Sequence, residues 1–206
     1  MKFVVLSSSR GTTFQAVLDR IADGSLSARC VGLVTDRMDR GCAHKARQCN
    51  IPILVPDADE AGSYRHLIPR SIMELALVGP GPHPDLLIAA MGWMHIVSPQ
   101  CIREWPNRIL NVHPALLPKH GGRNMFGMKV HEAVIAAGEK ESGMTIHVMD
   151  EGIDTGKIIF QKTCPVLPTD TPETLKERVQ ELEKEWYPRV LEMIERGELR
   201  LTDERN

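Results

Sequence analysis

An asparagine and a histidine two residues apart are the clearest sign of chemistry in this sequence, in the segment Asn111-Val112-His113-Pro114. The segment from Ile109 to Val112 predicts a strand, and successive side chains of a strand point to opposite faces. We therefore expect Asn111 and His113 to share one face at the carboxyl end of the strand, where open α/β sheets bind ligands. An amide can donate to a developing oxyanion, and an imidazole can move a proton. The pair favours acyl transfer over a purely structural role.

A turn of small residues, from Ser7 to Thr13, follows the first predicted strand. Small side chains let a ligand approach the backbone, and the N-terminus of the next helix presents free N–H groups and a positive dipole end. Arg10 adds a full positive charge. Gly11 is the only glycine there and no Gly-Lys-Ser/Thr follows, which excludes the dinucleotide fingerprint and the P-loop. A phosphate site and a plain helix cap remain the two alternatives.

The acidic loop from Asp150 to Gly156 joins two predicted strands. An ordinary acidic turn is one interpretation. The other is that Asp154 lies beside His113, where its negative charge would stabilise the imidazolium form and raise the pKa of the histidine. The sequence does not give the distance between the two side chains.

Short β-branched runs alternate with helical patterns, which is typical of a parallel α/β sheet. We expect a single-domain, Rossmann-like, mostly parallel twisted sheet flanked by helices, with a domain over 1–200 and a polar tail over 201–206. The predicted strands are Phe3 to Leu6, Cys30 to Val34, Ile51 to Val55, Leu86 to Ala90, Ile109 to Val112, Met144 to Val148 and Lys157 to Thr163. The last two could pair as a hairpin. The predicted helices are Thr13 to Ala22, Gly41 to Cys49, Tyr64 to Leu77, Val130 to Ala137 and a long helix that starts after Thr171.

The long helix carries an N-terminal signal, with Thr171 as the expected N-cap and Pro172 at the first helical position. Its apolar residues recur at spacings of three and four, which predicts one buried face: Leu175, Val179, Leu182, Trp186, Val190 and Ile194. The charged residues of the opposite face are expected to be solvated.

Charge and composition exclude several classes of function. The 25 Lys and Arg against 27 Asp and Glu give a net charge of −2, which disfavours a non-specific nucleic-acid or membrane binder. No stretch approaches the roughly 20 apolar residues that span a bilayer, and the start lacks a secretory signal pattern. The five cysteines form no Cys-x-x-Cys pair, so we expect reduced thiols, no metal site and a cytoplasmic protein.

Four segments together resemble the phosphoribosylglycinamide formyltransferase family, and the similarity covers nearly the whole chain. They are Leu110 to Lys119, the loop Asp150 to Gly156, the run Gly92 to Pro99 and the helical stretch Arg178 to Pro188. The resemblance implies formyl transfer from 10-formyltetrahydrofolate to the amine of 5-phosphoribosylglycinamide in purine biosynthesis, through a tetrahedral intermediate. The partners it implies are these two small molecules, with no nucleic acid or membrane, and the protein would be a monomer or homodimer.

The resemblance also implies a role for particular residues. By this comparison Asn111 holds the oxygen of the intermediate, His113 donates or relays the proton, and Asp154 raises the pKa of His113. The implied ribonucleotide contacts are Arg10, Gly11, Thr12, Thr13, Gln180 and Glu183. The implied folate contacts are Met94, His95, Ile96, Val97, Asp150, Glu151, Gly152 and Ile153.

Departures from the family pattern fall at the phosphate turn, at His95 and in the loop 121–128, which is longer than in many members. His147 also matches a family histidine, and a core histidine is the alternative interpretation. With few aromatic residues in the chain, we expect aliphatic side chains and backbone around Met94 to Val97 to hold the folate ring, with Trp93 the nearest aromatic in sequence.

Three other functions stay open at this stage. One is a formyltransferase that acts on an amino sugar nucleotide or on initiator methionyl-tRNA. Another is a hydrolase that releases formate from the same folate. The third is a non-catalytic nucleotide-binding module, which would need no proton-relay trio.

Overall fold

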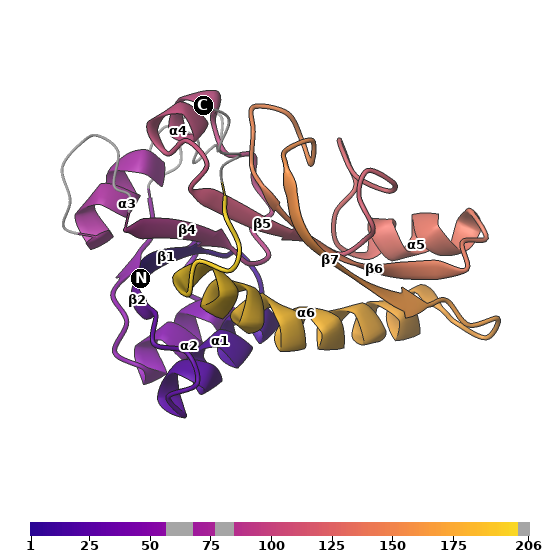
Figure 1. The fold of residues 1–206 in the computed structure, drawn as a ribbon, viewed down its shortest axis with the longest axis horizontal. Coiled ribbons are helices and arrows are strands. Elements are labelled where there is room, and N and C mark those ends of the chain that lie inside the picture. The colour runs from indigo at the N-terminus through magenta and orange to yellow at the C-terminus, as the bar shows by residue number, and fades with distance from the viewer. Residues whose placement is uncertain (57–67, 77–84, 202–206) are drawn as a thin grey trace.

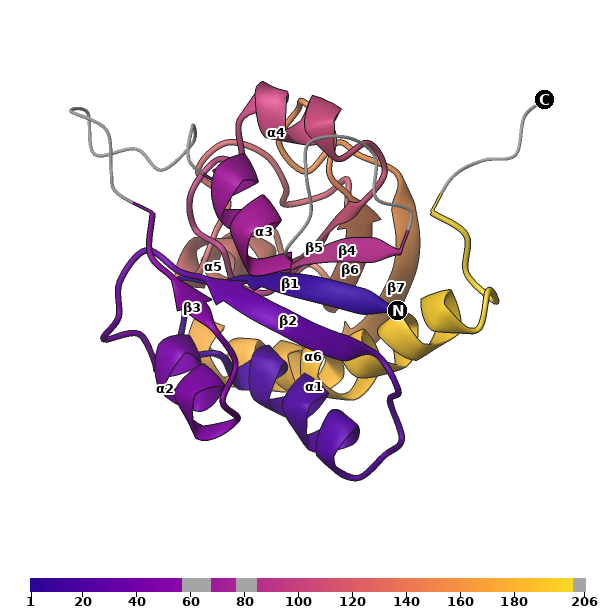
Figure 2. The same ribbon diagram turned by 90° about the vertical axis from the view of Figure 1, so that its left-hand side faces the viewer.

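One seven-stranded sheet organises the chain in the computed structural model, which describes residues 1–56, 68–76 and 85–201. The strands are β1 Lys2–Leu6, β2 Arg29–Val34, β3 Ile53–Leu54, β4 Leu86–Ala90, β5 Ile109–His113, β6 Glu141–Val148 and β7 Ile158–Pro165. Their order across the sheet is β3-β2-β1-β4-β5-β6-β7 (Figure 1, with β3 labelled in Figure 2). The pairs from β3 to β5 are parallel, whereas β6 and β7 are antiparallel. The expected mostly parallel α/β sheet and the expected terminal hairpin are both confirmed.

Helices cover both faces of this sheet, and Figure 2 shows α1, α2 and α6 below it with α3 and α4 above. The helices are α1 Thr12–Ala22, α2 Gly41–Gln48, α3 Ile68–Ala76, α4 Pro99–Glu104, α5 Met128–Ala136 and α6 Pro172–Glu195. None of the helices in the described part of the chain is long and apolar enough to cross a membrane.

Successive residues of the central strands point to opposite faces of the sheet and pack in two separate hydrophobic cores. Phe3 and Val5 of β1 pack with α1, α2, α5 and α6, whereas Val4 and Leu6 pack with α3 and α4. All four side chains are completely buried. This two-sided burial explains why the strand is apolar without alternation, as is typical of parallel sheets covered on both faces.

The long helix α6 begins as the sequence predicts. The Thr171 side chain accepts a hydrogen bond from the Thr174 backbone N–H, and Thr174 reciprocates in a capping box. The predicted apolar face is largely correct, since Leu175, Val179 and Val190 are buried. Tyr187 and Glu183, which the apolar pattern does not include, are buried as well.

Several boundaries differ from the sequence prediction. The expected strand Ile51 to Val55 is only two residues long, because it pairs at the edge of the sheet with just Leu33 and Val34. β6 begins three residues before Met144, because its antiparallel pairing with β7 extends to Glu141. The short helix α4 was not predicted, although Ser98 caps it by accepting a hydrogen bond from the Cys101 N–H at 3.2 Å.

Some expectations lie wholly or partly outside the described residues. The expected helix Tyr64 to Leu77 is described only over its central part, as α3. The Pro-rich linker at 79–84 and residues 202–206 of the expected tail are not described. The thiols of Cys42, Cys101 and Cys164 are buried, Cys30 is half-buried and Cys49 is exposed; none of them forms a disulfide.

Candidate active site

A cavity of about 880 Å³ opens at the carboxyl ends of the parallel strands. Most of the residues singled out from the sequence line it: Arg10, Thr12, Thr13, Met94, His95, Ile96, Val97, Asn111, His113, Asp150, Gly152, Ile153, Asp154, Gln180 and Glu183. Gly11 and Glu151 are the exceptions. Glu151 is exposed, and its carboxylate instead accepts a hydrogen bond from Arg103 at 2.9 Å. The fold therefore gathers residues from five separate segments around one space.

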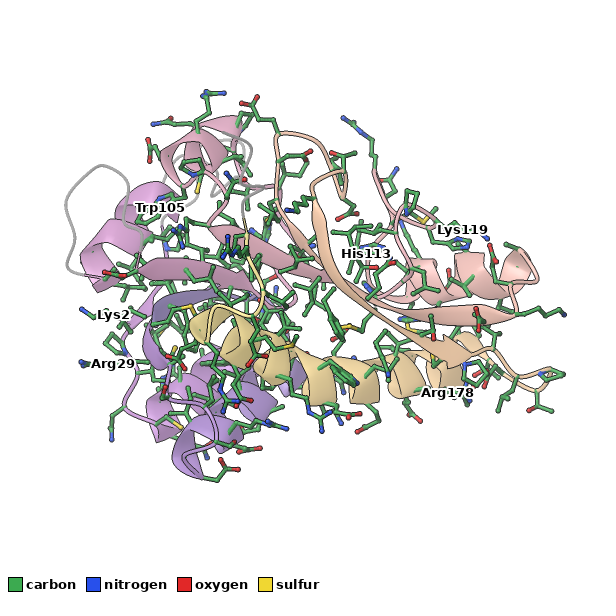
Figure 3. The ribbon with its side chains drawn as sticks, viewed as in Figure 1. Lys2, Arg29, Trp105, His113, Lys119 and Arg178 are labelled. Carbon is green, nitrogen blue, oxygen red and sulfur yellow. The ribbon has the colours of Figure 1, made fainter. Side chains whose placement is uncertain are left out.

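Asp154 lies at the centre of the polar cluster in this cavity. Its Oδ2 lies 3.5 Å from His113 Nδ1 and accepts a hydrogen bond from the Gly122 N–H at 3.0 Å. Its Oδ1 lies 3.6 Å from Nε2 of His147. The β6–β7 connection thus carries the carboxylate to the end of β5, a proximity that the sequence alone left open. Figure 3 shows His113 at this end of the sheet, with Lys119 further toward α5.

One nitrogen of His113 forms a hydrogen bond with the backbone. His113 Nε2 lies 2.8 Å from the carbonyl oxygen of His120. Because a carbonyl can only accept, Nε2 must carry a hydrogen. Nδ1, which faces Asp154, is therefore the nitrogen at which the protonation state of the ring changes.

Burial and charge act in opposite directions on His113. Burial disfavours the imidazolium form, and Asp154 favours it, with the net result that the pKa of His113 is lowered from its ordinary value. Asp154 thus contributes in the expected direction, but the expectation of a raised histidine pKa is wrong because desolvation is the larger effect. For Asp154, burial raises its pKa, but the close contacts with His147 and His113 and the hydrogen bond from the Gly122 N–H outweigh this effect and lower it.

Asn111 and His147 are neighbours across the sheet. They form a directly opposed pair of β5 and β6, and Asn111 Nδ2 lies 3.1 Å from His147 Nε2. His147 is 2 % exposed. One hydrogen of the amide can be donated to the histidine, which leaves the second hydrogen for a ligand in the cavity. His147 therefore contacts both Asn111 and Asp154 and holds them in one arrangement.

The turn before α1 has a backbone that only glycine fits. Gly11 has a φ of 73°, and a Cβ there would lie 2.8 Å from the Cα of Cys42. Gly11 N donates to the Ser9 hydroxyl at 3.1 Å, and no side chain caps the helix. The first N–H groups of α1 are consequently available to a ligand, with Arg10 and Thr12 on the wall of the cavity.

Thr13 and Glu183 connect this turn to α6. The Thr13 hydroxyl donates to the Glu183 carboxylate at 3.0 Å. Glu183 is only 9 % exposed, and burial raises its pKa to about 7. The expectation of a solvated face fails at this position because the helix turns Glu183 toward α1. At neutral pH this carboxyl can either donate or accept a hydrogen bond.

The segment after β4 lies directly against the same turn. The Ser8 hydroxyl accepts a hydrogen bond from the Met94 N–H at 2.9 Å. His95 Nε2 lies 3.4 Å from the carboxylate of Asp36, which Arg40 also binds through two nitrogens. Although burial raises the pKa of Asp36, these partners lower it overall. The expected phosphate and folate segments are thereby held together at one end of the cavity.

Comparison with known proteins decides the family. A family model described as formyl transferase matches residues 1–191. The chain belongs to the formyl transferase family. Its resemblance to this family, stated from the motifs, is confirmed.

Individual family members show the extent of the similarity. The chain is 37% identical over 194 residues to the chloroplastic phosphoribosylglycinamide formyltransferase of Arabidopsis thaliana, covering 94% of this chain but 65% of that protein. It is 33% identical to phosphoribosylglycinamide formyltransferase of Bacillus subtilis (strain 168), covering 94% of both chains. The crystal structure of glycinamide ribonucleotide transformylase 1 from Symbiobacterium toebii matches with a TM-score of 0.82 at 29% identity, covering 96% of this chain and 88% of that chain.

This member of the family also lines its cavity with residues that the sequence analysis missed. They are Arg37, Arg40, Phe126, His131 and Lys176. For Lys176 a signal was present, because it precedes Gln180 and Glu183 by four and seven residues on one helix face. For the others, no local pattern distinguishes a cavity wall from an ordinary surface. Phe126 is 49 % exposed on the cavity wall, whereas Trp93, which also lines the cavity, packs largely into the core beside α3 and α4.

Proposed function

We propose that the chain transfers a formyl group from 10-formyltetrahydrofolate to the amine of 5-phosphoribosylglycinamide, a step of purine biosynthesis. The observation that carries this proposal is the meeting of Asn111, His113 and Asp154 in one cavity that also reaches the turn before α1. The family and the names of its similar members support it. The chain spans slightly less than two thirds of the plant relatives, so their activity enters here as part of the proposal.

The ribonucleotide fits the end of the cavity formed by α1 and α6. Free N–H groups at the start of α1 and the charge of Arg10 suit its phosphate. Gln180 and Glu183 line the same region from α6 and offer hydrogen bonds to the ribose. This arrangement assigns the substrate's phosphate to the α1 end and its amine to the His113 end.

The folate fits the wall of the cavity that is formed by the segment after β4 and the loop before α5. Met94 and Ile96 are exposed there at 49% and 45%, and Phe126 faces the same space. Exposed apolar side chains around a cavity are typical of a ligand site, because a bound ring would remove them from water. We assign the pocket for the ring to these side chains with Val97, and its polar contacts to Asp150, Gly152 and Ile153.

The bound folate supplies the formyl group, and the residues of this chain handle charge and protons. When the amine adds to the formyl carbon, Asn111 can donate its second amide hydrogen to the oxygen that becomes negative. His113 starts neutral, so its Nδ1 can take the proton of the attacking amine, and Asp154 stabilises the resulting imidazolium. A new C–N bond forms, the bond from the formyl carbon to the folate nitrogen breaks, and His113 returns the proton to that nitrogen.

A steady-state assay tests this function by following the change in folate absorbance. We expect turnover with 10-formyltetrahydrofolate and 5-phosphoribosylglycinamide, and a loss of about 10²–10⁴-fold in His113→Ala. An amino sugar nucleotide, initiator methionyl-tRNA and water alone are the comparison acceptors. Turnover with one of them in place of the ribonucleotide would identify one of the alternative functions and contradict the proposal.

The proposal also covers the localisation and the oligomeric state of the protein. We infer a cytoplasmic enzyme that acts as a monomer or homodimer, on the basis of the reduced cysteines and the small-molecule substrates. Size-exclusion chromatography with light scattering would measure the oligomeric state.

A further inference from the structure

A buried histidine on the cavity wall has no role in the mechanism described above. His131 lies in α5, lines the cavity and is 2 % exposed. Its Nδ1 is buried and has no hydrogen-bond partner among the described residues. An unsatisfied buried polar group costs about 1–3 kcal/mol, and in native proteins such a group usually has a specific explanation. A partner supplied by a ligand is one such explanation for a residue on a cavity wall.

The neighbours of His131 place it on the ribonucleotide side of the cavity. Its electrostatic neighbours are Lys176 of α6 and the catalytic candidate His113. Helices α5 and α6 pack against each other, and Gln180 and Glu183 of α6 line the same space. His131 therefore lies between the expected ribose contacts and the expected site of the reacting amine.

The charge state of His131 limits the kinds of ligand group with which it can form a hydrogen bond. Burial and the positive charge of Lys176 lower the pKa of His131 to about 4. The ring is thus neutral at pH 7, with one nitrogen that donates and one that accepts. A neutral imidazole suits an uncharged hydroxyl or amide better than a phosphate, which would favour the charged form.

We propose that His131 is a substrate-binding residue that forms a hydrogen bond with an uncharged hydroxyl or amide group in the middle part of the ribonucleotide, between its phosphate and its amine. This inference rests on the proposed function. It adds a residue of α5 to the ribonucleotide site, which the family motifs assign only to the turn before α1 and to α6. The ring takes no part in the proton transfer, so its contribution is to affinity.

Titration calorimetry with 5-phosphoribosylglycinamide in the absence of folate tests the proposal. His131→Phe keeps a buried ring but removes both nitrogens, and we expect it to weaken ribonucleotide binding by about 10–100-fold. His131→Asn and His131→Gln each restore an amide near one of the two nitrogen positions. We expect at least one of them to bind within about threefold of the wild type.

Kinetics and stability provide the controls. In the steady-state assay His131→Phe should raise the KM for the ribonucleotide, with kcat at saturation and the KM for the folate changed less than about twofold. Its Tm should be no lower than that of the wild type, because it removes an unpaired buried nitrogen. His44→Asn changes an exposed histidine of α2 away from the cavity and should behave as the wild type.

The outcomes separate this inference from the proposed function. If the wild type turns over the ribonucleotide but His131→Phe binds it within twofold of the wild type, only the role of His131 is wrong. Equal losses in the Phe, Asn and Gln variants would also contradict a hydrogen bond. If the wild type neither binds nor turns over the ribonucleotide, both proposals fail.

Discussion

His113 illustrates at the scale of one residue how burial and a neighbouring charge set the starting state of the proposed proton relay. Its Nε2–H is held by the carbonyl of His120, and its Nδ1 faces Asp154. Burial lowers its pKa, and Asp154 opposes that shift. In the proposed mechanism the ring is therefore a neutral base beside an anion that stabilises its protonated form.

Replacement of the carboxylate tests this balance. Asp154→Asn removes the charge that favours the imidazolium, so the pKa of His113 should fall further. We expect kcat to drop by about 10²-fold and the acid limb of the kcat/KM profile to move to lower pH. Asp19→Asn, which changes an exposed carboxylate of α1, is the control. An unchanged profile and rate would show that Asp154 does not tune His113.

Asn111 offers a separate prediction at the same scale. Asn111→Ala removes the donor assigned to the developing oxyanion, and the loss of one such donor typically costs about 10²–10³-fold in kcat. The KM values should stay within about threefold, since the contact strengthens only as the charge develops. Stopped-flow single-turnover rates with saturating substrates measure the effect. Parallel losses in binding and rate would instead indicate a folding role.

At the scale of elements, the segment between β5 and α5 positions the imidazole. Glu139, which follows α5, accepts hydrogen bonds from Lys119 at 3.0 Å and lies 3.3 Å from His120 Nε2. Both contacts lower the pKa of Glu139. The carbonyl of His120 in turn accepts the hydrogen of His113, so an ion pair at the surface is linked to the candidate active site through the backbone.

Neutralising Glu139 tests that link. Glu139→Gln weakens the hold on Lys119 and His120, and we expect kcat to fall by roughly tenfold because a displaced catalytic group loses its alignment. The Tm should change little, since ion pairs at the surface contribute little to stability. Glu132→Gln on the exposed face of α5 is the matched control. A kcat equal to that of the control would show that the surface pair does not position His113.

At the scale of the whole molecule, the Thr13–Glu183 contact joins segments 170 residues apart. The folded protein raises the pKa of Glu183 from 4.5 to about 7, so the folded state binds a proton more tightly than the unfolded state does. Stability from this group is complete below pH 4.5 and is lost as the pH rises to about 7. The ionised carboxylate therefore destabilises the fold at alkaline pH.

Glu183→Gln removes this ionisation. At pH 8 we expect the variant to be more stable than the wild type by on the order of 3 kcal/mol, or roughly 5–10 °C in Tm for a chain of this size. At pH 4.5 the two proteins should unfold at nearly the same temperature. Calorimetry across this pH range measures the difference, with Glu177→Gln on the exposed face of α6 as the control. A difference in Tm that does not depend on pH would contradict the buried, titrating carboxyl.

Local sequence patterns determined the elements of this protein and the identity of its candidate reacting groups. The strand period places Asn111 and His113 on one face, and Thr171 marks the start of α6, because both depend on residues close together in the chain. The two core faces of β1 follow from the same kind of pattern.

Only the tertiary structure decided how distant groups meet and which protonation states result. The β6–β7 hairpin brings Asp154 to His113, and the packing of α6 buries Glu183 against Thr13. α5 turns His131 toward the cavity. The burial of a side chain depends on all the elements packed around it, and its desolvation increases with that burial. A local sequence pattern therefore could not predict that the pKa of His113 is lowered rather than raised.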